Sequence, residues 1–429
     1  MRIAVQGRVS LRGDYHPSGN SNAAIGAIAA AMLTEAPTSL KRFPRTRSTE
    51  AMLNVAQQLG TTIVEDKANT IQLLTPHIQT RILDPTMTRD IAASILFLAP
   101  MIIRRQHARI DWLRPINRLH THLTALHELG QTVDVEGHHI TVTAERWDTA
   151  ELVLTWPSVT ATALVCMLAA GLGRKTTIYN AASEPHLRLL QHQLVQLGAQ
   201  VEGIGSNLVT IFGWGDKPGP ADVELPTDHI EIASIAAISA MNEGQVDIHD
   251  VYLPDMRMIL KVYERLGMDY YLENTPENGD HQILHIPEQR HLKISRASGD
   301  TPTIDTAPWP GFPSDLMAIT TVLATQARGT TLIHEKLFDN RLLFTDKIKA
   351  MGGNILLCDP HRAVVFGHSP LRGEYIDSPD VRVGLALLAA ALCAEGETII
   401  DNAQLIDWAF HDITTKLSTL GAKIEGVSL

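Results

Sequence analysis

The chain has 429 residues, of which 45% are hydrophobic and 19% charged, enough to form two or three ordinary cores. Asp and Glu number 47 against 36 Lys and Arg, so the formal net charge is −11. This balance excludes a protein that binds nucleic acid through its overall charge. An anionic ligand would need a local cluster of cations.

The first 15 residues, MRIAVQGRVSLRGDY, alternate like a β-strand and lack the apolar core of a signal peptide. No apolar stretch is long enough, without polar breaks, to span a bilayer, so we expect a cytoplasmic protein without membrane partners. Cys166, Cys358 and Cys393 each lie in an apolar run, which predicts buried, unpaired thiols. The spacing of the cysteines and histidines favours neither a disulfide framework nor a metal site.

A repeat of about 70 residues runs along the chain. Six amphipathic helices are predicted, each ending in a large apolar residue and a glycine, followed by a β-rich stretch. A glycine at the end of a helix takes a positive φ without strain. The six glycines are Gly60, Gly130, Gly198, Gly267, Gly352 and Gly421.

A second helix precedes each of these, and it is apolar on all sides and rich in Ala and Ser. Such helices are expected to be buried within the protein. Most lead through a short turn into another strand, so the unit is helix, strand, helix, strand with further strands around it. Six units predict an α/β protein of two domains, because single cores stop growing near about 250 to 300 residues. The predicted buried helices are 22–36, 90–103, 158–172, 231–244, 314–326 and 382–396.

The one irregular spacing, between Gly267 and Gly352, contains residues 274–282 and 296–315. These segments read as an inserted hairpin and a long Pro-rich loop. Long loops often carry functional residues.

Polar residues stand at the starts of the buried helices. Ser and Asp there are ordinary N-caps, but Arg382 opposes the helix dipole, which suggests an anionic partner. Several converging helix N-termini with added Arg side chains would suit a phosphate and a carboxylate together. Outside the helices, the candidate cations are Arg341, Arg45, Arg47, Arg114 and Arg118, although each is also typical of a solvated surface charge. The helix-start residues are Asn22, Asp90, Ser158 with Thr160, Asp228 with Glu231, Ser314 with Asp315, and Asp380 with Arg382.

The strings PSGNSNAA at 17–24, NAASEPH at 180–186, TAPWPGFPSD at 306–315 and FDNR at 338–341 resemble the UDP-N-acetylglucosamine enolpyruvyl transferases. The resemblance covers nearly the whole chain, and enolpyruvylshikimate-phosphate synthases match these strings less well. It implies a two-domain inside-out α/β barrel built from six units. One domain would comprise residues 22–227 and the other residues 1–21 plus 228–429, with hinges near 21 and 227 and a substrate cleft between them.

The family transfers the enolpyruvyl group of phosphoenolpyruvate to a hydroxyl of UDP-N-acetylglucosamine, releasing phosphate in peptidoglycan precursor synthesis, without a metal or cofactor. By this match, Asp315 is the carboxylate base, and Arg341 and Arg382 bind phosphoenolpyruvate. The match also implies contacts with the acceptor. Asn22 would contact the sugar, and the nucleotide would lie against Ser158, Val159 and Thr160. Glu184 is a further substrate-binding candidate.

The chain departs from the family pattern at three places. Ser21 stands where the family has Lys, and Ala92 where it has an Arg in the second buried helix. The family's Gly-rich loop with its proton-donating Cys is replaced by a shorter segment, 108–122, without Cys. Replacement groups would come from the same region: Arg89, Arg114 and Arg118 for the charge, and Asp111 or His120 for the proton.

Three hypotheses therefore remain open. The chain acts on UDP-N-acetylglucosamine, or it uses the same fold and chemistry on another nucleotide or alcohol acceptor. Alternatively, it is a non-catalytic protein that binds a nucleotide sugar or a partner protein, because a fold alone does not determine a function.

Overall fold

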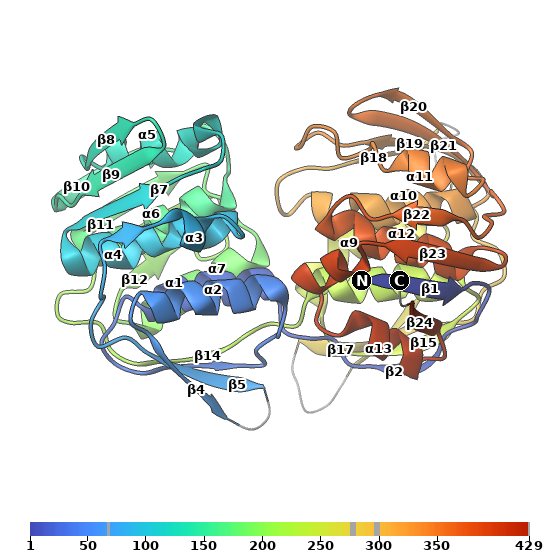
Figure 1. The fold of residues 1–429 in the computed structure, drawn as a ribbon, viewed down its shortest axis with the longest axis horizontal. Helices are drawn as coiled ribbons and strands as arrows, with labels where there is room; N and C mark the ends of the chain where they lie inside the picture. The colour runs from blue at the N-terminus through green and yellow to red at the C-terminus, as the bar shows by residue number, and fades with distance from the viewer. Residues whose placement is uncertain (67–68, 275–279, 296–300, 428–429) are drawn as a thin grey trace. The chain divides into compact units, whose positions relative to one another are not determined.

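The structure is a computed structural model that describes residues 1–66, 69–274, 280–295 and 301–427. The chain divides into two compact units (Figure 1). Unit 1 comprises Met1–Ser18 and Thr227–Leu429, and unit 2 comprises Gly19–Pro226. Each unit contains three four-stranded sheets. The six sheets confirm the prediction of an α/β fold built from six repeated units.

One repeat in unit 2 shows the pattern. Two parallel strands, β10 and β11, are joined by the buried helix α6; an amphipathic helix, α7, then leads into the hairpin β12–β13, which pairs antiparallel with β11. The buried helix thus forms a crossover between parallel strands, as these connections require. The bounds are β10 Trp147–Val153, α6 Val159–Leu172, β11 Gly173–Tyr179, α7 Pro185–Gln196, β12 Gln200–Glu202 and β13 Leu208–Phe212.

The other two sheets of unit 2 follow the same order of strands. One contains β14 Ala221–Glu224, β3 Thr38–Lys41, β5 Thr70–Leu74 and β4 Thr62–Asp66, with helices α1 Ser21–Ala31 and α2 Arg47–Gln58. The other contains β6 Ile82–Leu83, β7 His107–Asp111, β9 His139–Thr143 and β8 Thr132–Glu136, with helices α3 Pro85–Thr88, η1 Ala92–Phe97, α4 Leu98–Arg105, η2 Ile116–Leu119 and α5 His120–Glu128.

Unit 1 repeats this arrangement three times. The first sheet contains β2 Arg12–Tyr15, β15 Gln245–Tyr252, β17 His281–Ile286 and β16 Tyr271–Asn274, with α8 His229–Met241 and α9 Leu253–Arg265. The second contains β18 Thr303–Asp305, β19 Gly329–His334, β21 Arg362–Gly367 and β20 Ile355–Asp359, with η3 Ser314–Leu316, α10 Met317–Gln326 and α11 Thr345–Ala350. The third contains β22 Tyr375–Asp377, β23 Glu397–Asp401, β1 Arg2–Gln6 and β24 Lys423–Val427, with α12 Val381–Cys393, η4 Ala403–Trp408 and α13 Ile413–Thr419.

Strands that are distant in sequence complete three of the sheets. β1 lies between β23 and β24, β2 pairs with β15, and β14 pairs with β3. The two ends of the described chain therefore lie in one sheet, where the N and C marks stand close together in Figure 1. These pairings assign the N-terminal strands to unit 1.

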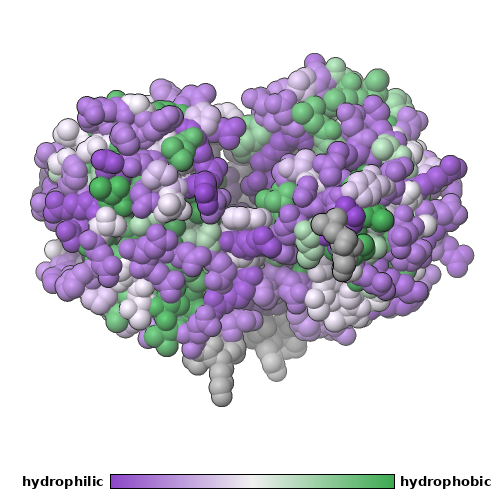
Figure 2. Space-filling model, viewed as in Figure 1, coloured by the Kyte–Doolittle hydropathy of each residue, from purple (hydrophilic) through white to green (hydrophobic). Residues whose placement is uncertain are grey.

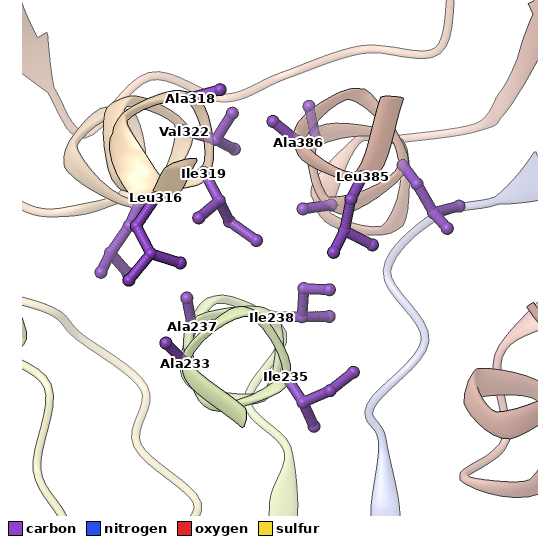
Figure 3. Close-up of a cluster of buried hydrophobic side chains, with 14 of the residues drawn as sticks. Ala233, Ile235, Ala237, Ile238, Leu316, Ala318, Ile319, Val322, Leu385 and Ala386 are labelled. Atoms are coloured by element: carbon purple, nitrogen blue, oxygen red, sulfur yellow. The ribbon is translucent and has the colours of Figure 1, made fainter. Parts of the chain in front are cut away.

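The core of unit 1 forms around α8, α10 and α12. Ile238, Ile319 and Leu385, one from each helix, point into the space between the three helices (Figure 3), and all are at most 3% exposed. Alanines on these helices allow the backbones to approach closely. The prediction that the all-round apolar helices are buried is confirmed.

Two sequence predictions need correction. Residues 90–103 do not form one helix, because a 3₁₀ segment, η1, precedes α4. Pro100 has no N–H to donate, and the restart at Leu98 places it in the first turn of α4, where no donor is required. Cys358 is exposed rather than buried, since it lies on the outward side of β20, and Cys393, the last residue of α12, is only partly buried; Cys166 is buried as predicted.

β16 and β17 pair antiparallel, but they form the regular hairpin of the repeat, equivalent to β12–β13, so the prediction of an inserted hairpin between Gly267 and Gly352 is wrong. The turn of this regular hairpin, residues 275–279, lies outside the described residues, as do residues 296–300 at the start of the predicted Pro-rich loop. The rest of that loop contains β18 and leads into η3.

All six repeat glycines have a positive φ, as predicted, and Gly267 and Gly421 offer a matched test. A Cβ on Gly267 would lie 2.3 Å from the backbone N of Lys293, whereas one on Gly421 would lie 3.8 Å from its nearest neighbour, the Ser10 carbonyl oxygen. Gly421→Ala should cost about 1 to 2 kcal/mol through its backbone conformation, and Gly267→Ala distinctly more because of the added clash. Urea unfolding of both variants measures the difference; equal losses would contradict it.

The surface drawn in Figure 2 is mainly hydrophilic, with hydrophobic residues scattered over it. Among the described residues, no helix combines the length and the apolar character needed to cross a membrane.

Candidate functional site

Three of the predicted site residues lie together in unit 1. The carboxylate oxygen Oδ1 of Asp315 accepts hydrogen bonds from Arg341 Nη1, at 3.4 Å, and from Arg382 Nε. The side chains of Asp315 and Arg341 are only 27% and 21% exposed, while that of Arg382 is 47% exposed. One carboxylate and two guanidinium groups thus share a partly enclosed position at the starts of α10 and α12.

Asp315 is not a helix cap. Neither η3 nor α10 has a side-chain cap, and the described partners of the Asp315 carboxylate are the two arginines. Capping, the structural alternative for this residue, is therefore wrong. The charge of Arg382, which opposes the dipole of α12, is compensated by Asp315.

Arg382 is placed by a well-formed helix start. Asp380 caps α12 by accepting hydrogen bonds from the backbone N of Arg382, at 2.8 Å, and of Val383, at 2.9 Å. A cavity of about 220 Å³ opens here, lined by Ser314, Arg341 and Arg382 among others. The amino end of α12 and two guanidinium groups around one cavity are the features that an anion requires.

Glu335 is a positioning residue that the sequence analysis missed. It is fully buried just after β19, and its carboxylate accepts hydrogen bonds from Ser314 Oγ at 2.6 Å and from the backbone N of Leu337 at 2.9 Å. It therefore ties the segment that carries Asp315 to the segment that leads to Arg341. The Arg341 guanidinium also lies over the Phe338 ring, 4.2 Å from its centroid.

Replacing Glu335 tests this positioning role. Glu335→Ala leaves the hydroxyls of Ser314 and Thr306 and two backbone N–H groups without their acceptor, so we expect a loss of about 2 to 4 kcal/mol in unfolding free energy. Glu335→Gln keeps the shape and should cost less while still weakening anion binding at Arg341. Urea unfolding and titration with phosphoenolpyruvate measure the two effects; unchanged anion affinity in both variants would remove Glu335 from this role.

The electrostatics keep Asp315 ionised. Burial opposes ionisation, but the charges of Arg382 and Arg341 outweigh it and lower the pKa of Asp315 to about 2. Burial and the nearby charge of Arg382 in turn lower the pKa of Arg341. Two cations are thus held close together, and a small anion between them would relieve their repulsion.

The start of α8 contributes a second buried polar group to unit 1. Asp228 caps α8 by accepting hydrogen bonds from the backbone N of Ile230 and Glu231. Burial, followed by the charge of Glu231, raises the pKa of Asp228 to about 7, and the charge of Asp315 adds to the effect. Glu231 is 1% exposed and is compensated by Lys416, whose Nζ lies 2.7 Å from its Oε1.

In unit 2, three candidates lie together at the end of β7. Arg114 Nη2 donates to the backbone O of Arg89 at 2.7 Å, and Asp111 ends β7. The Asp111 carboxylate accepts hydrogen bonds from Arg109 and is hydrogen-bonded to His139, and these contacts lower its pKa despite partial burial. Much of the segment 108–122, taken as a loop from the sequence, is in fact strand and helix. Arg118 lies in η2 and His120 begins α5, both exposed.

The remaining candidates of unit 2 lie at helix starts. Ser158 caps α6, as predicted, by accepting from Ala161 N. Thr160 Oγ1 lies 2.9 Å from Nε2 of the buried His122, whose pKa is lowered to about 4 by burial. The cap of α1 is Asn20 rather than Asn22, which leaves the Asn22 side chain exposed. Glu184 precedes α7 and is half-buried.

Within the described part of the chain, no group of three or more His, Cys, Asp or Glu side chains is arranged to hold a metal ion. The chemical groups gathered around Asp315 are a carboxylate, two guanidinium groups and a helix amino end. This arrangement can bind a small anion and accept a proton beside it.

The chain matches the family model described as EPSP synthase (3-phosphoshikimate 1-carboxyvinyltransferase) over residues 5–417. It is 39% identical to a UDP-N-acetylglucosamine 1-carboxyvinyltransferase of Treponema denticola over 427 residues, 98% of each chain. It is also 39% identical to one of Bradyrhizobium diazoefficiens, over all of this chain and 98% of the relative.

Among solved structures, the fold is similar to the enolpyruvyl transferase NikO from Streptomyces tendae, with a TM-score of 0.87 at 21% identity over 99% of this chain and 98% of that one. It is also similar to an EPSP synthase from Acinetobacter baumannii, with a TM-score of 0.76 at 18% identity over 99% and 100%. The chain therefore belongs to the enolpyruvyl (carboxyvinyl) transferase family, which includes the UDP-N-acetylglucosamine 1-carboxyvinyltransferases.

Proposed function

We propose that this chain transfers the enolpyruvyl group of phosphoenolpyruvate to a hydroxyl of UDP-N-acetylglucosamine and releases inorganic phosphate, a step of peptidoglycan precursor synthesis in the cytoplasm. The observation that carries the proposal is the contact of Asp315 with both Arg341 and Arg382 beside one cavity. Full-length relatives named for this activity, at 39% identity, support it.

In this proposal Arg341 and Arg382 bind the phosphate and carboxylate of phosphoenolpyruvate, and Asp315 takes the proton of the acceptor hydroxyl as its oxygen attacks the enol carbon. A carboxylate with a pKa of about 2 is a weak base. When a substrate anion draws the guanidinium groups toward itself, Asp315 loses part of their stabilisation and its pKa rises. The bound anion would thus make Asp315 a stronger base, because it competes with Asp315 for the same two arginines.

The residues of unit 2 complete the proposal as acceptor ligands. Asn22 would touch the sugar, and Ser158, Val159 and Thr160 the nucleotide, with Glu184 as a further contact. Arg89, Arg114 and Arg118 would supply charge that the family places at the positions of Ser21 and Ala92. For proton donation to the substrate, the ionised state of Asp111 disfavours that residue and leaves His120 as the better candidate.

A transferase of the same chemistry acting on another acceptor is the second candidate, favoured by Ser21, Ala92 and the absence of Cys from 108–122. Phosphate release from phosphoenolpyruvate separates the two. The protein is assayed with UDP-N-acetylglucosamine, with other UDP-sugars, with shikimate 3-phosphate and without acceptor. Release that depends on UDP-N-acetylglucosamine supports the first proposal, and release with another acceptor alone supports the second. No release with any of them contradicts both.

A further inference from the structure

A cluster of basic side chains, two Arg and two His, lies in unit 1 at the carboxyl ends of α8 and α10. Arg290, His291, Arg328 and His368 line a cavity of about 70 Å³ there. The arginines of the candidate active site lie at the opposite end of α10, whose 10 residues span about 15 Å. The cluster is therefore distinct from the Asp315 site.

Backbone hydrogen bonds hold the three segments of this cluster together. Arg328 N donates to Leu292 O at 2.8 Å, and Ser369 N donates to Thr325 O at 2.7 Å. Gly329 pairs with Gly367 at the ends of β19 and β21, which places Arg328 beside His368. The cations are thus brought together by the sheet and the end of α10.

The charge of the cluster is not neutralised in the described structure. The side chains of Arg290 and Arg328 make no hydrogen bond or ion pair with any described residue, whereas Arg12 and Arg362, also exposed in unit 1, each pair with a carboxylate. Burial, and then the charges of Arg328, His291 and Arg8, lower the pKa of His368, as expected where cations face one another.

Two structural explanations account for only part of this arrangement. The carboxyl ends of α8 and α10 attract nearby cations, but that effect is confined to the last turn of each helix. Glu243 also lines the cavity, yet it forms no ion pair with either arginine. In a chain with a net charge of −11, such a concentration of positive charge is a specific local feature.

We propose that this cluster binds a small oxyanion with two or more negative charges, a phosphate or diphosphate group, at a site separate from Asp315. The guanidinium groups of Arg290 and Arg328 would donate charge-assisted hydrogen bonds to its oxygens, with His291 and His368 beside them. The volume of about 70 Å³ limits the ligand to a small anion, since pockets for larger organic ligands measure about 300 to 1,000 Å³.

The test uses inorganic pyrophosphate as the probe, and it is made in Arg341→Gln/Arg382→Gln protein so that the two arginines beside Asp315 do not contribute. Calorimetric titration of this protein should show a pyrophosphate site that does not depend on those two arginines. Adding Arg290→Gln and Arg328→Gln should weaken it about tenfold or more, given the loss of two charge-assisted contacts at an exposed site. Adding Arg257→Gln is the matched control: it removes an exposed Arg on α9 that pairs with no described residue, and it should leave the affinity unchanged.

Hydrogen exchange locates the bound ion independently. Pyrophosphate should protect the amides of 289–292, 326–330 and 366–369. The proposal would be overturned if pyrophosphate did not bind at millimolar concentration, or if Arg257→Gln weakened binding as much as the change of Arg290 and Arg328. It would also be overturned if pyrophosphate protected only amides outside these three segments. Thermal unfolding of each variant checks that its fold is retained. The Arg290→Gln/Arg328→Gln variant with Arg341 and Arg382 intact should keep its transferase activity, which separates this site from the reaction at Asp315.

Discussion

Asp315→Asn should lower the turnover number about 10²- to 10⁴-fold while leaving phosphoenolpyruvate bound at least as tightly as in the unaltered protein. The loss follows from removing the group that accepts the hydroxyl proton. The binding is retained because Asp315 occupies both Arg341 and Arg382 in the structure and competes with the substrate anion for them. Steady-state kinetics and calorimetric titration measure the two quantities separately.

Asp359→Asn is the matched control for this variant. Asp359 lies in the same unit, at the end of β20, and pairs with Arg362, and neither residue lines the cavity beside Asp315. It should leave both turnover and binding unchanged. If Asp315→Asn kept full turnover, Asp315 would not be the base; if it lost both turnover and binding, its role would be to hold the arginines in place.

Arg341→Gln and Arg382→Gln should each weaken the binding of phosphoenolpyruvate about 10- to 100-fold, because each removes a charge-assisted hydrogen bond to the anion. We expect the loss to appear mainly in KM where the contact is the same in the ground state and the transition state. Arg362→Gln, from the control ion pair, should have no effect. Unchanged affinity in both active-site variants would place the anion elsewhere.

The same variants change the pH dependence of stability. The folded-state pKa of Asp315, about 2, lies below its ordinary value of 3.8, so the ionised group stabilises the fold above about pH 4. That contribution is lost as the pH falls toward 2. Arg382→Gln raises the folded-state pKa, so the variant is less stable than the unaltered protein above pH 4, and the difference shrinks below it. Urea unfolding between pH 2 and 6 measures this; a constant difference would contradict the assignment.

The repeat could be predicted because its signals are local. A glycine at a helix end has a conformational reason to be there, and all six have the positive φ that reason requires. The buried helices were recognisable because apolar residues on every side leave no face for water. The pairing of β1 with β23 and of β14 with β3 could not be predicted from local signals. In each pair the two strands are far apart in the sequence, as Ile3 with Ile400 and Thr38 with Ala221 show.

The candidate site was predicted in part. Asp315, Arg341 and Arg382 stood out through helix starts and matched strings, and the structure places them in contact. Glu335 was missed, although it continues the inward series of Thr331 and Ile333 along β19. A carboxylate at an inward position of an alternating strand indicates buried hydrogen-bond donors, and here they are Ser314 and the backbone that leads to Arg341.

The most direct test of the central claim is mass spectrometry of the products formed from phosphoenolpyruvate and UDP-N-acetylglucosamine. The unaltered protein should yield the enolpyruvyl ether of the nucleotide sugar, with one phosphate released for each product molecule, and Asp315→Asn should yield almost none. Intact phosphoenolpyruvate and unmodified nucleotide sugar after prolonged incubation, or equal product from both proteins, would contradict the account.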